Sequence, residues 1–428
     1  MRVQSLVLGL LAAIICAPVI AEAPPRFPAG AVWHKDISKE RLHRRSGSMI
    51  STLVGLGGFG NGRMQIDFGM HIVRAPPGAP LRGIVGYPTD SEYYAPDCDA
   101  IGTTMPVPAN AAIEGQNGLA CDNDNGDCHL LVVQGQRLYE VYRANASGLN
   151  GLQAQCLAVW KLDWLYPADN RGDHCTSADA AGFPIAPMLF NADEVHAAMQ
   201  TGGDLGHAIR FILPNARMAS RLIGGNRRPI YVRPASHAGG PSGPDTSVPY
   251  GSRLRLRADF PVALYTPAAQ VILRTLQRYG MLLADGGNIA LTAESDKYTT
   301  HTWAELGITS RTFDQQVPGT PVRAQDFGVV EHGGRIVETY ECVRNPEPDA
   351  GIAPSVLTGI VPAGSRPPRV QLRWQGGAAR IDVYRNNVRS LTIDNHGAAS
   401  PLLPLGTSSY KVCNTETALC SAAVTLAR

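Results

Sequence analysis

The residues best suited to chemistry lie in CDNDNGDCHLLVVQGQRLYEVYRAN, residues 121–145. Asp127 and His129 stand two positions apart at the start of an expected strand, 129–133, so their side chains face the same side. Glu140 lies on the expected hairpin partner, 138–143, within cross-strand reach of that face. An Asp, a His and a Glu gathered there could serve as an acid/base set. A solvated outer sheet face would have the same pattern, so the sequence leaves both interpretations open.

Further candidates stand at strand ends or in apolar turns. Asp179 lies in TSADAAGFPIAP (176–187), beside Ser177, where a carboxylate either accepts backbone hydrogen bonds or acts with a shifted pKa. His207 and His237 occur near the ends of expected strands. We expect the catalytic carboxylates to be Asp127, Glu140 and Asp179, and their polar partners to be His129, His207 and His237. We expect the substrate to be contacted by Asp67, Arg210, Tyr231, Arg253 and Arg255.

Three arginines alternate along residues 252–260. Arg253, Arg255 and Arg257 share one face of this expected strand with Asp259. Such a cationic face would suit a polyanionic glycan, and His, Tyr and Arg side chains could then eliminate a uronate. A solvated face whose arginines are paired with acids is the alternative.

The acids around Asp122 and Asp124 do not match an EF-hand. Gly126 falls at position 5 of the loop instead of 6, and position 12 is Val133 instead of Glu. A non-helical structural calcium site or a disulfide-closed, solvated turn remains, and we expect no other cofactor. The sequences GxSxG, HExxH and the Walker loop do not occur, which argues against the common serine hydrolases, zincin proteases and NTPases. The formal net charge of +2 gives no electrostatic reason to expect a nucleic acid or an anionic membrane as partner.

Strand patterns dominate the chain. Apolar and polar residues alternate over 64–72 and 252–260, and shorter strands are expected at 157–162, 207–213, 229–233, 281–284 and 289–292. The chain contains 45 Gly and 32 Pro, a combined share above the roughly 12% of average proteins, which indicates many turns. Helices are expected at 192–200, 299–307 and 266–280, the last with Thr266 as N-cap, Pro267 at its first position and Gly280 after its end. We predict an all-β fold: a β-sandwich or jelly-roll-like main domain with a few peripheral helices, and a small C-terminal β-sandwich module.

The expected order of segments begins with a signal peptide. Residues 1–21 carry Arg2, an apolar run at 6–15 and the small-residue end VIA, which predicts export to the periplasm or the cell exterior. An N-terminal extension (22–44), the main domain (45–343), a Pro-rich linker (344–366) and the module (367–428) follow. The apolar run is too short for a stable membrane span, and none is expected later in the chain.

Eight cysteines remain once Cys16 of the leader is set aside. An even number in an exported chain predicts disulfides. Cys413 pairs first with Cys420 because the two bracket a short loop between strand-like runs. The next local pairs are Cys121 with Cys128 and Cys156 with Cys175, which leaves Cys98 with Cys342. Only the first pair is firm, because six cysteines allow 15 connectivities. No CxxC pair supports a zinc site.

Two stretches resemble known groups of proteins. Residues 60–290 contain, in order, the blocks NGRMQIDFGMHIVRA, PVPANAAIEG, GDCHLLVV, LYEVYRA, TSADAAGFPIAP, LGHAIRFILP, YVRPASHA, GSRLRLRA and YGMLLADGG. This succession resembles a group of secreted bacterial and fungal proteins and implies one exported domain. The group has Arg and Leu where this chain has Cys128 and Phe183, departures that fit an added disulfide and a resized contact. Residues 367–428, with Trp374 and Tyr410 as aromatic centres, resemble the fibronectin type III modules of secreted bacterial hydrolases, which bind or space.

Three hypotheses for function follow. The first is a secreted enzyme that hydrolyses a polysaccharide with paired carboxylates along a groove on a sheet face. The second is a lyase that acts on an acidic glycan through His and Arg residues. The third is a non-catalytic protein that binds a polysaccharide or a cell-surface glycan. Convergence of Asp127, Glu140 and Asp179 in one concave site would favour an enzyme, and dispersal would favour binding. The sequence does not set the substrate or the oligomeric state.

Overall fold

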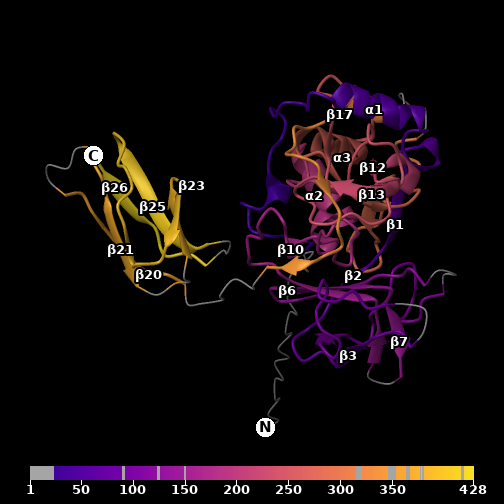
Figure 1. The fold of residues 1–428 in the computed structure, drawn as a ribbon, viewed down its shortest axis with the longest axis horizontal. Coiled ribbons are helices and arrows are strands. Elements are labelled where there is room, and N and C mark those ends of the chain that lie inside the picture. The colour runs from indigo at the N-terminus through magenta and orange to yellow at the C-terminus, as the bar shows by residue number, and fades with distance from the viewer. Residues whose placement is uncertain are drawn as a thin grey trace, which may run out of the picture.

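The computed structural model describes residues 24–88, 92–122, 126–148, 151–314, 321–345, 353–362, 367–375, 377, 380–415 and 419–428. The expected leader and Asp124 lie outside these residues. Strand residues outnumber helical ones, which confirms the predicted all-β class (Figure 1). The three α-helices of the described chain are α1 (Ser46–Gly55), α2 (Ala192–Thr201) and α3 (Pro267–Arg278). None of them combines the length and the apolar character needed to cross a bilayer.

A mixed six-stranded sheet forms the centre of the main domain. Its strands, in spatial order, are β1 (Ile66–Met70), β16 (Leu291–Glu294), β11 (Ile209–Leu213), β15 (Met281–Gly286), β14 (Arg253–Leu256) and β17 (Phe327–Val329). β1 runs parallel to β16 and β11 runs parallel to β15, pairings that alternation alone does not reveal. Ile209, Phe211 and Leu213 point into the main apolar core, while Arg210 and Ile212 face the opposite side.

Two smaller sheets form a second lobe. One has the order β2 (Ile72–Arg74), β5 (Leu130–Gln134), β6 (Arg137–Tyr142) and β9 (Cys156–Lys161). The other has the order β4 (Thr104–Pro106), β3 (Leu81–Val85), β8 (Gly151–Gln153) and β7 (Asn145–Ser147). The first sheet is buried on both faces: Leu131 and Trp160 belong to the main core, whereas Leu130 and Val132 belong to a second core. The lobe is therefore packed onto the main domain.

The segment 64–72 links the two lobes. Its expected single strand divides into β1, which joins the central sheet, and β2, which pairs with β5. His71 lies between them and its Nδ1 is 2.6 Å from Ser295 Oγ. The predicted hairpin is confirmed, because β5 and β6 pair antiparallel with Leu131 opposite Glu140.

The helix predictions were right twice. In α3, the Thr266 side chain accepts a hydrogen bond from Ala269 N, and Pro267 is the first residue of the helix. Gly280 follows with φ of 68°, and a side chain there would collide with Leu254 O. α2 is also confirmed. The helix expected at 299–307 was wrong.

A carboxylate explains the absence of that helix. The backbone N–H groups of Thr300 and His301 donate to Asp193 of α2, at 2.9 and 2.7 Å, and the described segment forms turns. α1 was not predicted. The strand expected at 252–260 ends at Leu256, because the chain turns where Phe260 N donates to Arg257 O.

Four disulfides are formed by the described cysteines. Cys121–Cys128 and Cys413–Cys420 confirm two predicted pairs. The predicted pairs Cys156–Cys175 and Cys98–Cys342 were wrong, since the bonds are Cys98–Cys156 and Cys175–Cys342. Sequence proximity failed here because hydrogen bonds from Asp99 N to Leu157 O, from Leu157 N to the Tyr93 hydroxyl and from Val159 N to Asp99 Oδ2 attach the 93–99 loop to β9, beside Cys156.

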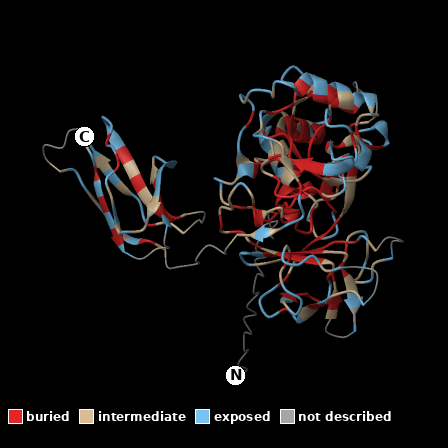
Figure 2. Cartoon of the chain, in the orientation of Figure 1, coloured by how far each residue is buried: buried red, intermediate tan, exposed pale blue. Residues whose placement is uncertain are grey.

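The remaining short strands surround the central sheet. β10 (Gly172–Asp173) pairs with β19 (Val343–Arg344), and β12 (Ser220–Ile223) pairs with β13 (Asn226–Tyr231), which pairs with β18 (Ile336–Val337). The residues preceding α1 are part of the domain's interior, since Phe27 and Trp33 are buried in the main core. Figure 2 shows the buried residues concentrated around the central sheet.

The C-terminal residues form a sandwich of two sheets with its own apolar core. One sheet contains β20 (Ser355–Ile360), β21 (Gln371–Gln375) and β24 (Ala398–Ala399). The other contains β23 (Val388–Asp394), β22 (Arg380–Arg385), β25 (Thr407–Asn414) and β26 (Val424–Ala427). Trp374 and Tyr410, the expected aromatic centres, are buried in this core.

Candidate active site

A pocket of about 790 Å³ lies between the central sheet and the second lobe. Four adjacent strands supply one side: Asp67 on β1, Thr292 on β16, Arg210 on β11 and Asp285 on β15. Asp67 and Thr292 are direct partners in the β1–β16 ladder. The second lobe supplies the opposite side, including Glu114 and His129, so segments far apart in sequence meet in one concave site.

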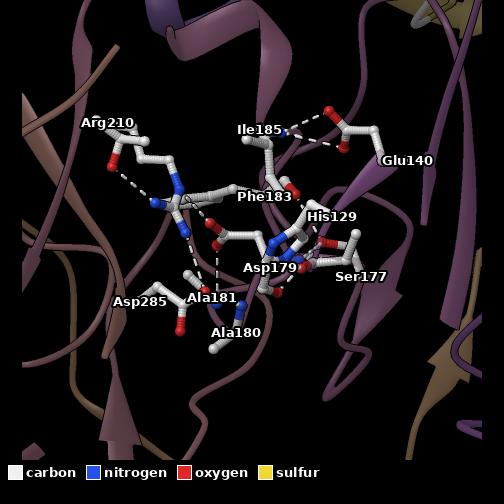
Figure 3. A network of polar contacts seen from close by, with 12 residues as sticks. His129, Glu140, Ser177, Asp179, Ala180, Ala181, Phe183, Ile185, Arg210 and Asp285 are labelled. Carbon is white, nitrogen blue, oxygen red and sulfur yellow. Dashed lines mark hydrogen bonds and ion pairs between the residues drawn. The ribbon is translucent and has the colours of Figure 1, made fainter. Parts of the chain in front are cut away.

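Arg210 organises the sheet side of the pocket (Figure 3). Its Nε donates to Asp179 Oδ2 at 2.7 Å, one terminal nitrogen donates to Asp285 Oδ2 at 2.9 Å, and the other donates to Thr292 Oγ1 at 2.9 Å. Burial opposes its charge, but the two carboxylates outweigh burial and raise the pKa of Arg210. A planar guanidinium suits such a fixed set of acceptors.

Asp179 lines the pocket but is fully buried. Its Oδ1 accepts a hydrogen bond from Ala181 N at 3.0 Å, and its own N–H donates to Ser177 Oγ at 3.0 Å. Burial raises the pKa of Asp179 to about 7 despite the opposing charge of Arg210. These contacts hold Arg210 and the loop 176–183 in place, so Asp179 is better placed to position its neighbours than to meet a substrate.

Glu114 and His129 form an ion pair on the lobe side. His129 Nδ1 lies 2.7 Å from Glu114 Oε2, and its Nε2 lies 3.1 Å from Ala178 O. Both partners are acceptors, so the ring satisfies both only with a proton on each nitrogen. Burial alone would lower the pKa of His129, but Glu114 outweighs it and raises the pKa to about 9. His129 is therefore a fixed cation and not a free base.

Replacing Glu114 by Gln should reverse this balance. In Glu114→Gln, burial becomes the dominant influence, and the pKa of His129 should fall from about 9 to about 6.5 or lower. An NMR titration of the imidazole resonances measures it. The raised pKa means that the pair stabilises the fold fully below pH 6.5 and loses this contribution as the pH rises through 9. Glu331→Gln, far from the pocket, should leave the titration of His129 unchanged; an equal effect of both variants would contradict the pairing.

Asp67 and Glu114 are neighbours whose environments differ. Both carboxyl groups border the space beside Gly69, where Asp67 Oδ1 and Glu114 Oε1 lie 3.1 and 3.7 Å from the position of an added Cβ. Burial and the nearby charge of Glu114 raise the pKa of Asp67. Burial opposes ionisation of Glu114 too, but the charge and hydrogen bonds of His129 outweigh it and lower the pKa of Glu114. The local environment thus raises the pKa of Asp67 and lowers that of Glu114.

The remaining lining residues surround the mouth. Asp127 is exposed, and the rings of Tyr94 and Tyr142 stack near it with centroids 6.4 Å apart. His237 Nδ1 lies 2.7 Å from Ala180 O, which requires a proton on Nδ1 and leaves Nε2 as an acceptor in the neutral ring. Tyr340 packs edge-on against His237. Tyrosine faces beside carboxylates are typical of sites that bind sugars or other polyhydroxylated molecules.

Comparison of the chain with protein-family models, curated proteins and solved structures finds no match. The chemistry of this pocket is therefore the basis on which a function can be assigned.

Among the described residues, one group of three potential metal-ligand atoms lies together, in Asp97, Cys175 and Cys342. Both sulfurs belong to a disulfide, which removes them as thiolate ligands. Asp122 accepts a hydrogen bond from Gln116, and its expected calcium partner Asp124 lies outside the described residues.

Several predicted site residues lie elsewhere. Glu140 shares a strand face with Leu131 but is directed into the core, where its carboxyl group accepts hydrogen bonds from Ile185 N (Figure 3) and Ala186 N, each at 2.8 Å. It also accepts one from Trp160 Nε1 at 3.0 Å. It is not among the described lining residues of the pocket. The prediction that Glu140 joins Asp127 and His129 in one site was wrong, because three donors hold its carboxyl group behind the pocket wall.

Removal of this carboxyl group should cost stability and not chemistry. Glu140→Ala leaves three buried donors without an acceptor, which should lower the free energy of unfolding by about 3 to 5 kcal/mol. Thermal denaturation should show a melting temperature lower by roughly 10 °C. Glu305→Ala, at an exposed turn, is the matched control and should change stability by less than about 1 kcal/mol. A variant of Glu140 that melts like the wild type would refute this role.

His207 and three expected substrate contacts are also outside the pocket. His207 is fully buried beside Arg26, and burial lowers its pKa well below the usual value. Tyr231 is buried, and its hydroxyl donates to Asp173 at 2.7 Å. The guanidinium groups of Arg253 and Arg255 donate to backbone carbonyls of residues 32–40 and, for Arg253, of Tyr279. The expected cationic glycan face is therefore the anchor of the N-terminal segment.

Six sequence candidates line the pocket: Asp67, Asp127, His129, Asp179, Arg210 and His237. Sequence reasoning missed Glu114 and Asp285. Both stand in blocks of the succession described above, AIEG and LADGG, where an acid follows an apolar run and precedes glycine. An acid at the end of a buried strand is the signal that would have revealed Asp285.

Proposed function

We propose that this protein is an exported glycoside hydrolase that cleaves a polysaccharide in the pocket between the central sheet and the second lobe. One observation carries the proposal: Asp67 and Glu114 are neighbouring carboxyl groups whose pKa values are driven in opposite directions. Glycosidases need such a pair, with one residue protonated and the other charged. The four disulfides support export, because disulfides persist in oxidising compartments.

Each residue then has a role that follows from its contacts. Asp67 Oδ1 accepts a hydrogen bond from Gly69 N at 2.8 Å, so Oδ2 can carry the proton that passes to the glycosidic oxygen. Glu114 Oε2 is held by His129, which leaves Oε1 beside Gly69 to activate water or to attack the anomeric carbon. Arg210, Asp285 and Thr292 form the adjoining surface on which the sugar hydroxyls bind.

A panel of polysaccharides tests the proposal. The purified protein is incubated with neutral and acidic glycans, and reducing ends and absorbance near 235 nm are followed. New reducing ends without absorbance are the expected result. Rising absorbance near 235 nm would show that the protein cleaves by elimination instead of hydrolysis. Binding without any new reducing ends would indicate a glycan-binding protein. Separately, we propose that the C-terminal module is a spacer or a binding module, because it resembles fibronectin type III modules.

A further inference from the structure

The charge of the pocket restricts the glycan that it can accept. The described lining contains seven carboxyl groups, one guanidinium, two imidazoles and no lysine. The cations are already committed: Arg210 binds two carboxylates, and His129 binds Glu114 and a carbonyl. Recognition of a uronate or a sulfated sugar requires a positive group directed at the ligand. The described lining offers no arginine or lysine that is not already bound to an acid, and its second imidazole, His237, binds Ala180 O.

The mouth of the pocket has the same sign as its interior. Glu92 and Asp127 are both exposed lining residues. Burial is the main cause of the raised pKa of Tyr142, the charges of Asp127 and Asp285 add to it, and the charge of Arg143 opposes it. A substrate with its own carboxylates would approach like charges in a concave site, where low-dielectric walls concentrate the field.

We infer that the substrate is a glycan without acidic groups, and that neutral and amino sugars enter where uronates and sulfated sugars are excluded. This inference rests on the proposed glycosidase function and narrows it. Carboxylates accept hydrogen bonds from sugar hydroxyls, and they attract ammonium groups. The tyrosine faces of Tyr94, Tyr142 and Tyr340 accept both uncharged and cationic sugars.

Matched pairs of glycans with one backbone test the inference. The pairs are hydroxyethyl- and carboxymethyl-cellulose, curdlan and carboxymethyl-curdlan, methyl-esterified and free polygalacturonate, and chitosan and its N-succinyl derivative. Hydrolysis is measured by reducing ends, and binding is measured separately by affinity electrophoresis. In each pair that is attacked or bound, the acidic member should be about tenfold or more poorer at low salt, and the gap should narrow in 0.5 M NaCl.

The mouth residues provide the second readout. The double variant Glu92→Gln/Asp127→Asn should reduce the discrimination between the members of a pair at least about threefold, and Asp259→Asn on the distant surface should not. Equal or better use of acidic members would overturn the inference and leave the hydrolase standing. Binding of the non-acidic members without hydrolysis would overturn the hydrolase proposal and support the inference that acidic glycans are excluded. If no pair is bound or hydrolysed, both the hydrolase proposal and the charge inference are overturned.

Discussion

Asp67→Asn should lower kcat by about 10²- to 10⁴-fold, the contribution expected of a general acid. The change is nearly isosteric: Asn keeps the oxygen that accepts the hydrogen bond from Gly69 N, and only the transferable proton is lost. The pKa of Asp67 is raised, so the alkaline limb of kcat/KM, which reports loss of its proton, should lie at a higher pH than an ordinary aspartic acid would give. The variant should lack this limb. Initial rates on the glycan identified by the panel measure both effects.

The leaving group distinguishes proton donation from a structural role. Dinitrophenolate departs from a glycoside without a proton, so Asp67→Asn should retain most of its kcat/KM on a dinitrophenyl glycoside of the sugar released in the panel. Asp259→Asn, the same substitution at a surface ion pair with Arg257, should behave like the wild type on both substrates. An equal loss on the natural glycan and on the dinitrophenyl glycoside would show that Asp67 does not donate the proton.

Periodicity predicted the elements well because it reports local geometry. The β5–β6 hairpin, α2 and α3 follow from alternation and capping, and the structure has all three. Periodicity also placed Glu140 and His129 on one face, which is correct. Periodicity does not show which part of that face meets the core. Glu140 lies in the part where the backbone N–H groups of Ile185 and Ala186 donate to its carboxyl group. The pattern gives the side of a strand and not the neighbour beyond it.

The composition of the pocket depends on pairings between distant segments. Asp67 and Thr292 meet because β1 runs parallel to β16 and the ladder places the two residues opposite each other. They are 225 positions apart in the chain. Nothing local in either strand encodes this partner. The prediction for Arg253, Arg255 and Arg257 failed for a related reason. Two of the three carbonyls that Arg253 binds belong to Val32 and Lys35, and alternation within one strand cannot show that a distant N-terminal segment covers it.

A loss of stability as large as that of Glu140→Ala is expected from Arg210→Met. This change leaves Asp179, which is fully buried, and Asp285 without the guanidinium that both bind. Breaking one partner of a buried ion pair costs about 3 to 5 kcal/mol, because an uncompensated charge remains in the interior. Arg257→Met provides the control, since its exposed ion pairs with Asp259 and Asp326 should contribute less than about 1 kcal/mol. Chemical denaturation measures both.

The pH dependence of this loss identifies its cause. In the folded wild type the pKa of Asp179 is raised to about 7, so its contribution to stability declines as the pH rises from 3.8 through 7. Without Arg210 the folded protein resists ionisation of Asp179 even more. The deficit of Arg210→Met relative to the wild type should therefore be larger at pH 7.5 than at pH 5, and Asp179→Asn added to Arg210→Met should recover part of it. A loss of stability that is the same at both pH values, or that Asp179→Asn does not relieve, would mean that Arg210 stabilises the sheet through packing alone. Its charge would then not be needed to compensate the buried carboxylates.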